Sequence, residues 1–304
     1  MRVAGIDCGT NSIRLLVADI DGGRMSELVR RMEIVRLGEG VDRTGRLSEA
    51  ALERTRKALA DYAAQIEGLG AERVRMVATS ASRDAENSAD FTAMVTRTLG
   101  VAPEVISGDE EAALSFGGAV RGLPADVASP FLVVDIGGGS TEFVRGSQAV
   151  EAARSMDIGC VRMTERHLKS DPPTPEQIAA AEADITAVVD TALSTVDPER
   201  RARTLVGLAG SVTTVTALAL GLTEYISERI HHTRVSYTDV ARITGELLAL
   251  TRAERLAFGV MHPGRADVIG AGAMILRIIM ERSGAESVIA SEHDILDGIA
   301  WSLT

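Results

Sequence analysis

Two glycine-containing turns of the same plan constrain this chain more than any other feature of its sequence. In the stretch VAGIDCGTNSIRLLV, an apolar run ends at Asp7, and a glycine and three polar residues precede the next apolar run. The stretch VVDIGGGSTEFV repeats this order around Asp135. Glycine adopts backbone dihedrals closed to other residues and lets N–H groups approach a ligand without an intervening side chain. Successive N–H groups in such a turn form a concavity that binds anions.

We therefore predict that both turns bind phosphate. A lone glycine-rich turn is equally consistent with a simple hairpin loop, and the match between the two turns favours phosphate binding. The candidate phosphate-binding residues are Gly9, Thr10, Asn11, Ser12, Gly137, Gly138, Gly139, Ser140 and Thr141. A carboxylate beside a phosphate is repulsive unless a cation lies between them. Asp7 and Asp135 therefore predict a bound Mg²⁺ or another divalent cation.

Other phosphate-binding motifs fit the sequence poorly. A Walker loop needs a lysine after its glycines, and neither of the two lysines, Lys57 and Lys169, follows a glycine-rich loop. The segment GAGAMI near Gly270 resembles the start of a dinucleotide fingerprint but lacks the preceding strand and the acidic partner. We interpret it as helix packing through small residues.

Composition excludes several classes of protein. The net charge of −11 argues against a general nucleic-acid-binding surface, which is usually basic. No apolar run reaches the roughly 20 residues that cross a bilayer, and the N-terminus does not resemble a secretion signal. Cys8 and Cys160 are the only cysteines and lack the spacing of metal ligands. We expect a cytoplasmic protein without nucleic-acid or membrane partners.

The predicted elements follow the same order twice, which indicates a duplicated α/β unit. Three strands begin the first half, with a hairpin turn at Asp21–Gly23, and helices alternate with strands up to about residue 117. A polar junction at 126–130 precedes three further strands. A long helix then begins at Thr174, because the residues TPEQ form a capping box with a first-turn proline.

Five motifs occur in an order that resembles the exopolyphosphatase / guanosine pentaphosphate phosphohydrolase family. They are DCGTNSIRLLVADI, ATSASRDAEN, ISGDEEAALSF, DIGGGSTEFV and GLAGSVTTVTAL. The resemblance implies two ribonuclease-H-like lobes of the actin-like type, as in acetate and sugar kinases, with the active site in the cleft between them. We expect an N-terminal lobe over 1–125 and a C-terminal lobe over 126–304, whose last helix can pack back on the first lobe. Longer family members carry a further helical domain, so this chain resembles the short form.

The resemblance assigns roles that residue type alone leaves open. Glu111 matches the proposed base of the family, although acidic residues are common in the first turn of a helix. Arg83 matches an arginine near the phosphate channel, where a guanidinium binds phosphate bidentately, but a surface ion pair is the alternative. Glu142 matches a residue that positions the metal or the water, and its alternative is a solvated strand residue. Gly210 and Ser211, in a third strand-then-glycine turn, either bind distal phosphates or shape the turn.

Further residues are weaker candidates. His231, His232 and Arg234 could line a substrate channel, but a histidine pair more often belongs to the surface or the core. Arg14 is a weak phosphate candidate because its position varies in the family. Cys8 is interpreted as a packing residue.

The function implied by the resemblance is Mg²⁺-dependent hydrolysis of the terminal phosphoanhydride of inorganic polyphosphate, with release of orthophosphate. The alternative substrate is guanosine pentaphosphate, cut at its 5′ γ-phosphate. A small-molecule kinase of the same fold and a non-catalytic sensor of phosphorylated nucleotides are less favoured. The short form leads us to expect short polyphosphates as substrates, and a homodimer is a family-level expectation.

Overall fold

The computed structural model describes all 304 residues and divides into two compact units. Unit 1 comprises residues 1–118 and 295–304, and unit 2 comprises residues 119–294. The expected lobes, 1–125 and 126–304, stay a prediction, and the last ten residues, which form the expected terminal helix, group with unit 1. No helix combines the length and the apolar character that a membrane crossing requires.

Unit 1 is built on a five-stranded sheet of order β3-β2-β1-β4-β5. The first three strands are antiparallel, and β4 and β5 continue the sheet in parallel with β1. The strands are β1 (Arg2–Cys8), β2 (Ser12–Asp21), β3 (Arg24–Ile34), β4 (Arg73–Ala78) and β5 (Glu104–Val105). Gly22 and Gly23 close the β2–β3 hairpin with φ values of 53° and 78°. Positive φ at both central residues suits the tight turn of a hairpin, and the predicted turn is confirmed.

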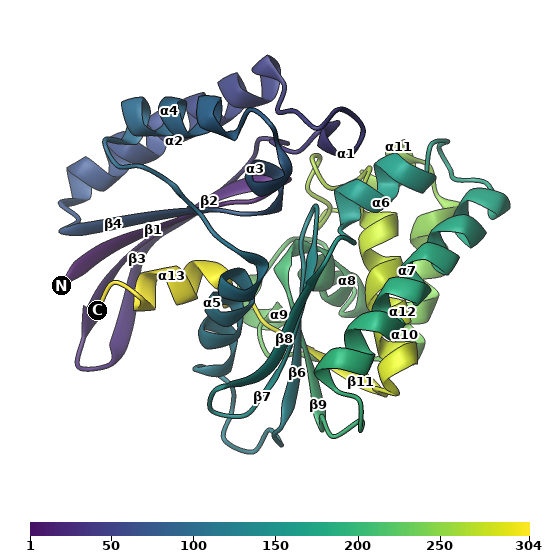
Figure 1. Cartoon of the computed structure of the whole chain (residues 1–304). Helices are drawn as coiled ribbons and strands as arrows, with labels where there is room; N and C mark the ends of the chain where they lie inside the picture. The colour runs from purple at the N-terminus through teal and green to yellow at the C-terminus, as the bar shows by residue number, and fades with distance from the viewer. The chain divides into compact units, whose positions relative to one another are not determined.

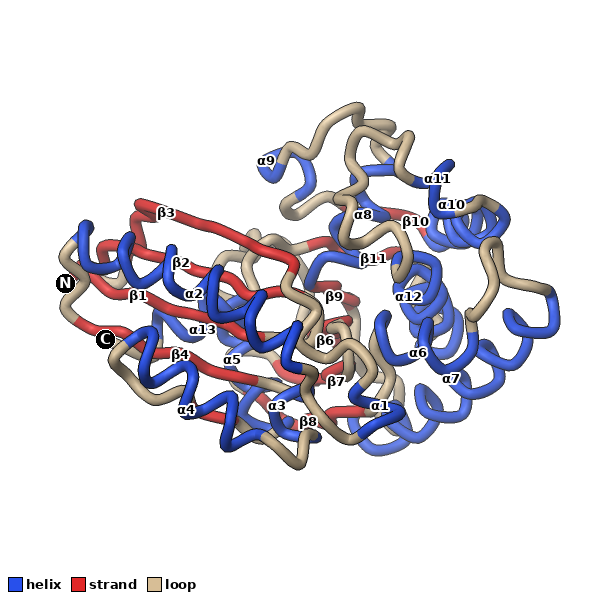
Figure 2. The backbone as a smooth tube through the Cα atoms, turned by 90° about the horizontal axis from the view of Figure 1, so that it is seen from above, coloured by secondary structure: helices blue, strands red, loops and turns tan.

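Helices cover both faces of this sheet because β1 and β2 are apolar on both sides. Side chains alternate along a strand, so Ile6 packs in one cluster with α2 (Glu49–Leu69) and α4 (Ser88–Leu99), while Val3 packs against α13 (Ile295–Trp301). Figures 1 and 2 show α2 and α4 lying over the sheet. The remaining helices are α1 (Val41–Thr44), α3 (Ser80–Asp84) and α5 (Gly108–Val120).

Unit 2 contains a six-stranded sheet of order β10-β11-β9-β6-β7-β8. Its strands are β6 (Phe131–Ile136), β7 (Thr141–Gly146), β8 (Val150–Met156), β9 (Thr204–Leu208), β10 (Arg234–Ser236) and β11 (Ser287–Ala290). The antiparallel meander β6–β7–β8 and the parallel strand β9 beside β6 repeat the arrangement of β1–β2–β3 and β4. The two units therefore share one plan, as the sequence pattern predicts.

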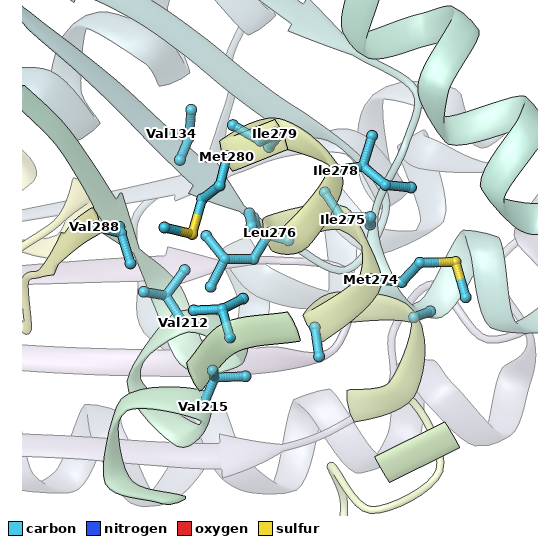
Figure 3. Packing of buried hydrophobic residues seen from close by; sticks show 14 of the residues in the cluster. Val134, Val212, Val215, Met274, Ile275, Leu276, Ile278, Ile279, Met280 and Val288 are labelled. Carbon is cyan, nitrogen blue, oxygen red and sulfur yellow. The ribbon is translucent and has the colours of Figure 1, made fainter. Parts of the chain in front are cut away.

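The main core of unit 2 surrounds α12 (Ile269–Ser283), which is buried along most of its length. Its side chains pack with α8 (Ala209–Ala219), β6 and β11, as Figure 3 shows for Leu276, Val212, Val134 and Val288. A Cβ atom at Gly272 would lie 2.1 Å from Ser211 Oγ, so glycine permits this close approach. The segment GAGAMI thus packs a helix, as predicted.

The other helices of unit 2 are α6 (Cys160–His167), α7 (Pro175–Val196), α9 (Ser227–Ile230), α10 (Tyr237–Ala249) and α11 (Arg252–Arg255). The capping box of α7 is present: the Thr174 hydroxyl accepts a hydrogen bond from Gln177 N, and the Gln177 side chain accepts one from Thr174 N. This local prediction is confirmed.

Candidate active site

The first glycine turn joins β1 to β2 in unit 1. Two of its carbonyls accept hydrogen bonds from the segment that follows β3. Thr10 O accepts from Gly38 N at 2.9 Å, and Asn11 O accepts from Arg36 N at 2.9 Å. A Cβ atom at Gly38 would lie 2.4 Å from Thr10 Cγ2, so only glycine allows the segment this close. The Thr10 hydroxyl lies 2.9 Å from that of Ser80, and both residues are buried. The turn is therefore a preformed structure.

Asp7 is the next-to-last residue of β1 and lies on the sheet face opposite the α2–α4 cluster. It is paired in register with Arg14 of β2, whose Nε and Nη2 both donate to Asp7 Oδ2, at 3.0 and 2.7 Å. Asp7 is only 4% exposed. A buried carboxylate needs a compensating charge, and the Arg14 guanidinium supplies one. Arg14, a weak phosphate candidate in the sequence, lies against this carboxylate.

Glu111 lies in the first turn of α5 and is 7% exposed, which is unusual for an acidic residue at a helix start. Its Oε2 accepts a hydrogen bond of 3.1 Å from Arg83 Nη1, which also donates to Ile106 O at 3.0 Å. The neighbouring Glu110 is exposed and pairs with Arg75 at 2.7 Å. The two glutamates therefore differ: Glu110 behaves as an ordinary first-turn acid, and Glu111 does not.

The second glycine turn follows β6 in unit 2 and rests on the N-terminus of α6. The carbonyl of Gly137 accepts from Cys160 N at 2.9 Å, and the carbonyl of Gly138 accepts from Val161 N at 2.9 Å. A Cβ atom at Gly159 would lie 2.4 Å from the carbonyl carbon of Gly138. Residue 159 must therefore be glycine for the turn and the helix to meet.

Two acidic side chains lie beside this turn. Asp135 of β6 and Glu142 of β7 are directly opposite each other in the antiparallel register. They are 7% and 1% exposed, and Glu142 Oε1 accepts from Ser155 Oγ at 2.7 Å. Opposite residues of an antiparallel pair have their Cβ atoms about 5 Å apart. Two buried carboxylates this close repel each other unless a cation or a proton is shared between them.

These residues fit a divalent cation. No group of three or more histidine, cysteine, aspartate or glutamate side chains forms a ready metal cage. Mg²⁺ typically needs only one or two carboxylates, with water and phosphate oxygens as the other ligands. Asp135 and Glu142 match that donor set, and Asp7 offers a carboxylate at the equivalent place in unit 1.

The third turn joins β9 to α8. A Cβ atom at Gly210 would lie 2.1 Å from Arg265 Nη2, so the Arg265 side chain lies directly over this glycine. Arg265 Nη1 also donates to Thr214 Oγ1 at 2.8 Å. Ser211 is buried against Gly272 of α12. This environment makes Ser211 a packing residue of the α8–α12 contact, whereas Gly210 lies under a cation.

Comparison with known proteins identifies the chain. Residues 16–304 match the model of the Ppx/GppA phosphatase family. The chain belongs to this family. A curated family relative, named Exopolyphosphatase 2 of Mycobacterium tuberculosis, is 51% identical over 99% of this chain and 98% of its own length.

Further members of the Ppx/GppA family share less of the sequence. A guanosine-5'-triphosphate,3'-diphosphate pyrophosphatase of Aeromonas hydrophila is 31% identical over 99% of this chain, which spans 59% of that relative. Among solved structures, one described as an exopolyphosphatase-like protein covers the whole chain at 46% identity with a TM-score of 0.95. The Aquifex aeolicus PPX-GPPA enzyme covers 99% of both chains at 33% identity with a TM-score of 0.83. The two-lobed, actin-like α/β fold predicted for the chain is confirmed.

Thr141, Cys8 and Arg234 take structural roles within this family fold. The Thr141 hydroxyl donates to Ile158 O, so its proton is used inside unit 2. Cys8 is fully buried, and burial raises the pKa of its thiol, as fits a packing residue. Arg234 begins β10 and donates to Ser287 Oγ at 2.9 Å. The Arg234 contact involves neither phosphate-binding turn, whereas Thr141 belongs to the second turn.

The predicted histidine pair forms part of a larger cluster in unit 2. The rings of His231 and His232 stack with centroids 3.6 Å apart, and His293 lies 4.5 Å from His231. Burial, followed by the nearby His293, lowers the pKa of His232. The sequence pointed to the pair but not to His293, which is distant along the chain.

Sequence reasoning missed the residues that support the turns. Gly38, Gly159 and Arg265 each lie against a predicted glycine turn, and Arg162 Nε donates to Gly139 O at 2.7 Å. Gly159, in the segment IGCVR, was the only one of these residues with a signal in the sequence. It is the N-cap of α6, a position where a polar side chain is more common than glycine.

Proposed function

We propose that this protein is an exopolyphosphatase that hydrolyses the terminal phosphoanhydride of linear inorganic polyphosphate and releases orthophosphate. The observation that carries the proposal is the 51% identity, over 99% of the chain, to a relative named Exopolyphosphatase 2. The glycine turns and the buried carboxylates support the same chemistry, because phosphoryl transfer depends on positioning and on neutralising phosphate charge.

In this proposal Glu111 accepts the proton of the attacking water. Its carboxylate is oriented by Arg83 through the Nη1–Oε2 hydrogen bond of 3.1 Å. The amides of the two glycine turns bind phosphate oxygens, and Gly210 with the Arg265 guanidinium gives a further contact for the anion. Asp135 and Glu142 of unit 2 would hold Mg²⁺, and Asp7 is the candidate carboxylate of unit 1. The cation would supply neutralisation of phosphate charge at these carboxylates.

Guanosine pentaphosphate is the second candidate substrate. It is favoured by the relative named guanosine-5'-triphosphate,3'-diphosphate pyrophosphatase, which is 31% identical to this chain. Both substrates end in a triphosphate-like group, so the same residues would act on either. We rank polyphosphate first because the more similar relative is named for it.

The test is a comparison of initial rates of orthophosphate release with Mg²⁺ present. The substrates are tripolyphosphate, longer polyphosphates of defined length, and guanosine pentaphosphate. We expect the highest kcat/KM on a polyphosphate, with short chains preferred. A clear preference for the nucleotide would reverse the ranking. Consumption of ATP, with ADP and a phosphorylated acceptor formed only when a sugar or acetate is present, would indicate a kinase instead.

The assembly and the location of the protein are part of the same proposal. We propose a cytoplasmic homodimer. Light scattering coupled to size-exclusion chromatography measures the mass in solution against the 32.1 kDa of one chain. A monomer at all accessible concentrations would contradict the dimer without affecting the proposed chemistry.

A further inference from the structure

The second glycine turn is held by its carbonyl oxygens, and this determines where its amides point. In a trans peptide, the C=O of one residue and the N–H of the next lie in one plane and point in opposite directions. The bond from Cys160 N to Gly137 O therefore directs the Gly138 N–H away from α6. The bond from Val161 N to Gly138 O does the same for the Gly139 N–H.

The third carbonyl of the turn is held differently. Gly139 O accepts a hydrogen bond of 2.7 Å from the side chain of Arg162, through Nε. The first two carbonyls are bound by backbone amides at the start of α6. The orientation of the peptide between Gly139 and Ser140 thus depends on a side chain, which a substitution can remove.

The carbonyl of this peptide is held by the Arg162 side chain. A flip rotates ψ of Gly139 and φ of Ser140, and glycine leaves the first of these angles unrestricted. A flip would replace the Ser140 N–H by a carbonyl oxygen on the ligand side of the turn. A carbonyl oxygen repels phosphate, whereas an N–H group attracts it.

We propose that Arg162 is a positioning residue of the phosphate-binding turn: its bond to Gly139 O keeps the Ser140 N–H directed at the bound anion. The inference rests on the proposed function of this turn. Arg162 is half-buried and has contacts besides Gly139. A test must therefore separate the hydrogen bond from the positive charge.

Three substitutions make this separation. Arg162→Lys keeps a donor and the charge, Arg162→Gln keeps a donor without the charge, and Arg162→Met keeps neither. Arg166→Met is the matched control, because Arg166 lies one turn later on α6 and pairs with Asp184 at 3.2 Å. Thermal melts verify folding, and Arg162→Ala repeats the loss of the donor should the Met variant not fold.

Steady-state kinetics on tripolyphosphate give the first readout. A charge-assisted hydrogen bond contributes enough that we expect Arg162→Met to raise KM about tenfold with a smaller effect on kcat. The Lys and Gln variants and the Arg166→Met control should stay within about threefold of wild type. Equal impairment of Gln and Met, with Lys spared, would assign the effect to charge and overturn the inference. Wild-type behaviour of all variants would also overturn it.

Calorimetric titration with inorganic triphosphate gives a second readout that does not require turnover. The Met variant should bind about tenfold more weakly than the Gln variant. If the wild-type protein fails to hydrolyse any polyphosphate, the proposed function is wrong. The titration then still decides the role of Arg162, because it measures anion binding alone.

Discussion

Arg83 Nη1 lies 3.1 Å from Glu111 Oε2, and this hydrogen bond joins α3 to the first turn of α5. The same nitrogen donates to Ile106 O, so the guanidinium has a fixed position. Glu111 is buried while the adjacent Glu110 is exposed. The arrangement orients a single carboxylate, as a residue that accepts a proton from water requires.

We predict that Glu111→Gln lowers kcat for polyphosphate hydrolysis by about 100-fold or more, because the amide cannot accept the proton. The side chain keeps its shape, so polyphosphate binding should persist. Orthophosphate release and calorimetric binding measure the two effects. Glu110→Gln is the control and should retain nearly wild-type kcat. Full activity of Glu111→Gln would contradict the role of this residue.

The carboxylates of Asp135 on β6 and Glu142 on β7 predict how the reaction rate depends on the Mg²⁺ concentration. Asp135→Asn and Glu142→Gln should each raise the Mg²⁺ concentration for half-maximal rate by about tenfold, because each removes one charged ligand. Chelation should abolish wild-type activity, and added Mg²⁺ should restore it. Asp19→Asn is a control, because that exposed carboxylate pairs with Arg2 at 2.9 Å. An unchanged Mg²⁺ requirement in both site variants would place the metal elsewhere.

Gly159→Ala should damage the second glycine turn. The new Cβ would lie 2.4 Å from the Gly138 carbonyl carbon, so the turn or α6 must shift. We expect a loss of about 1–3 kcal/mol in the free energy of unfolding and a fall in kcat/KM. Chemical denaturation and kinetics measure both.

Gly245→Ala provides the comparison in α10, where no atom lies near the added methyl group. A helical glycine replaced by alanine should stabilise the protein by about 0.5–1 kcal/mol. Equal stability of the two variants would show that the Gly159 contact is not tight.

The histidine cluster predicts that the free energy of unfolding decreases in mild acid. Burial lowers the pKa of His232 below its usual value of 6.5. As pH falls below 6.5, the unfolded chain therefore binds a proton that the folded chain does not, and stability decreases until the lower folded pKa is passed. The slope must stay below about 1.4 kcal/mol per pH unit, and partial exposure of the ring reduces it further.

Denaturation of wild type and His232→Asn at pH 7.5 and pH 5.5 tests this. Asparagine tolerates the positive φ of 62° at this position. The variant should lose less stability between the two pH values than wild type does. An identical loss would mean that another group titrates.

Local patterns were predictable from the sequence, and contacts between distant segments were not. The Asp21–Gly23 hairpin and the Thr174 capping box depend on neighbouring residues alone, and both are confirmed. The contact between Gly138 and Gly159 depends on how α6 packs under the turn. Residue type alone does not distinguish Glu110 from Glu111, because the orientation of α5 decides which one is buried.

The helix α13 covers one face of the unit 1 sheet, although the strands of that sheet lie much earlier in the sequence. Its Gly298 fits against Leu114 of α5, where a Cβ atom would lie 2.1 Å from the Leu114 carbonyl oxygen. Ribosomes therefore finish the continuous unit 2 before they make the piece that closes unit 1. During that interval the apolar side of the first sheet around Val3 and Leu16 lacks its cover. A first sheet that forms before residues 295–304 are translated would therefore expose this apolar face to solvent.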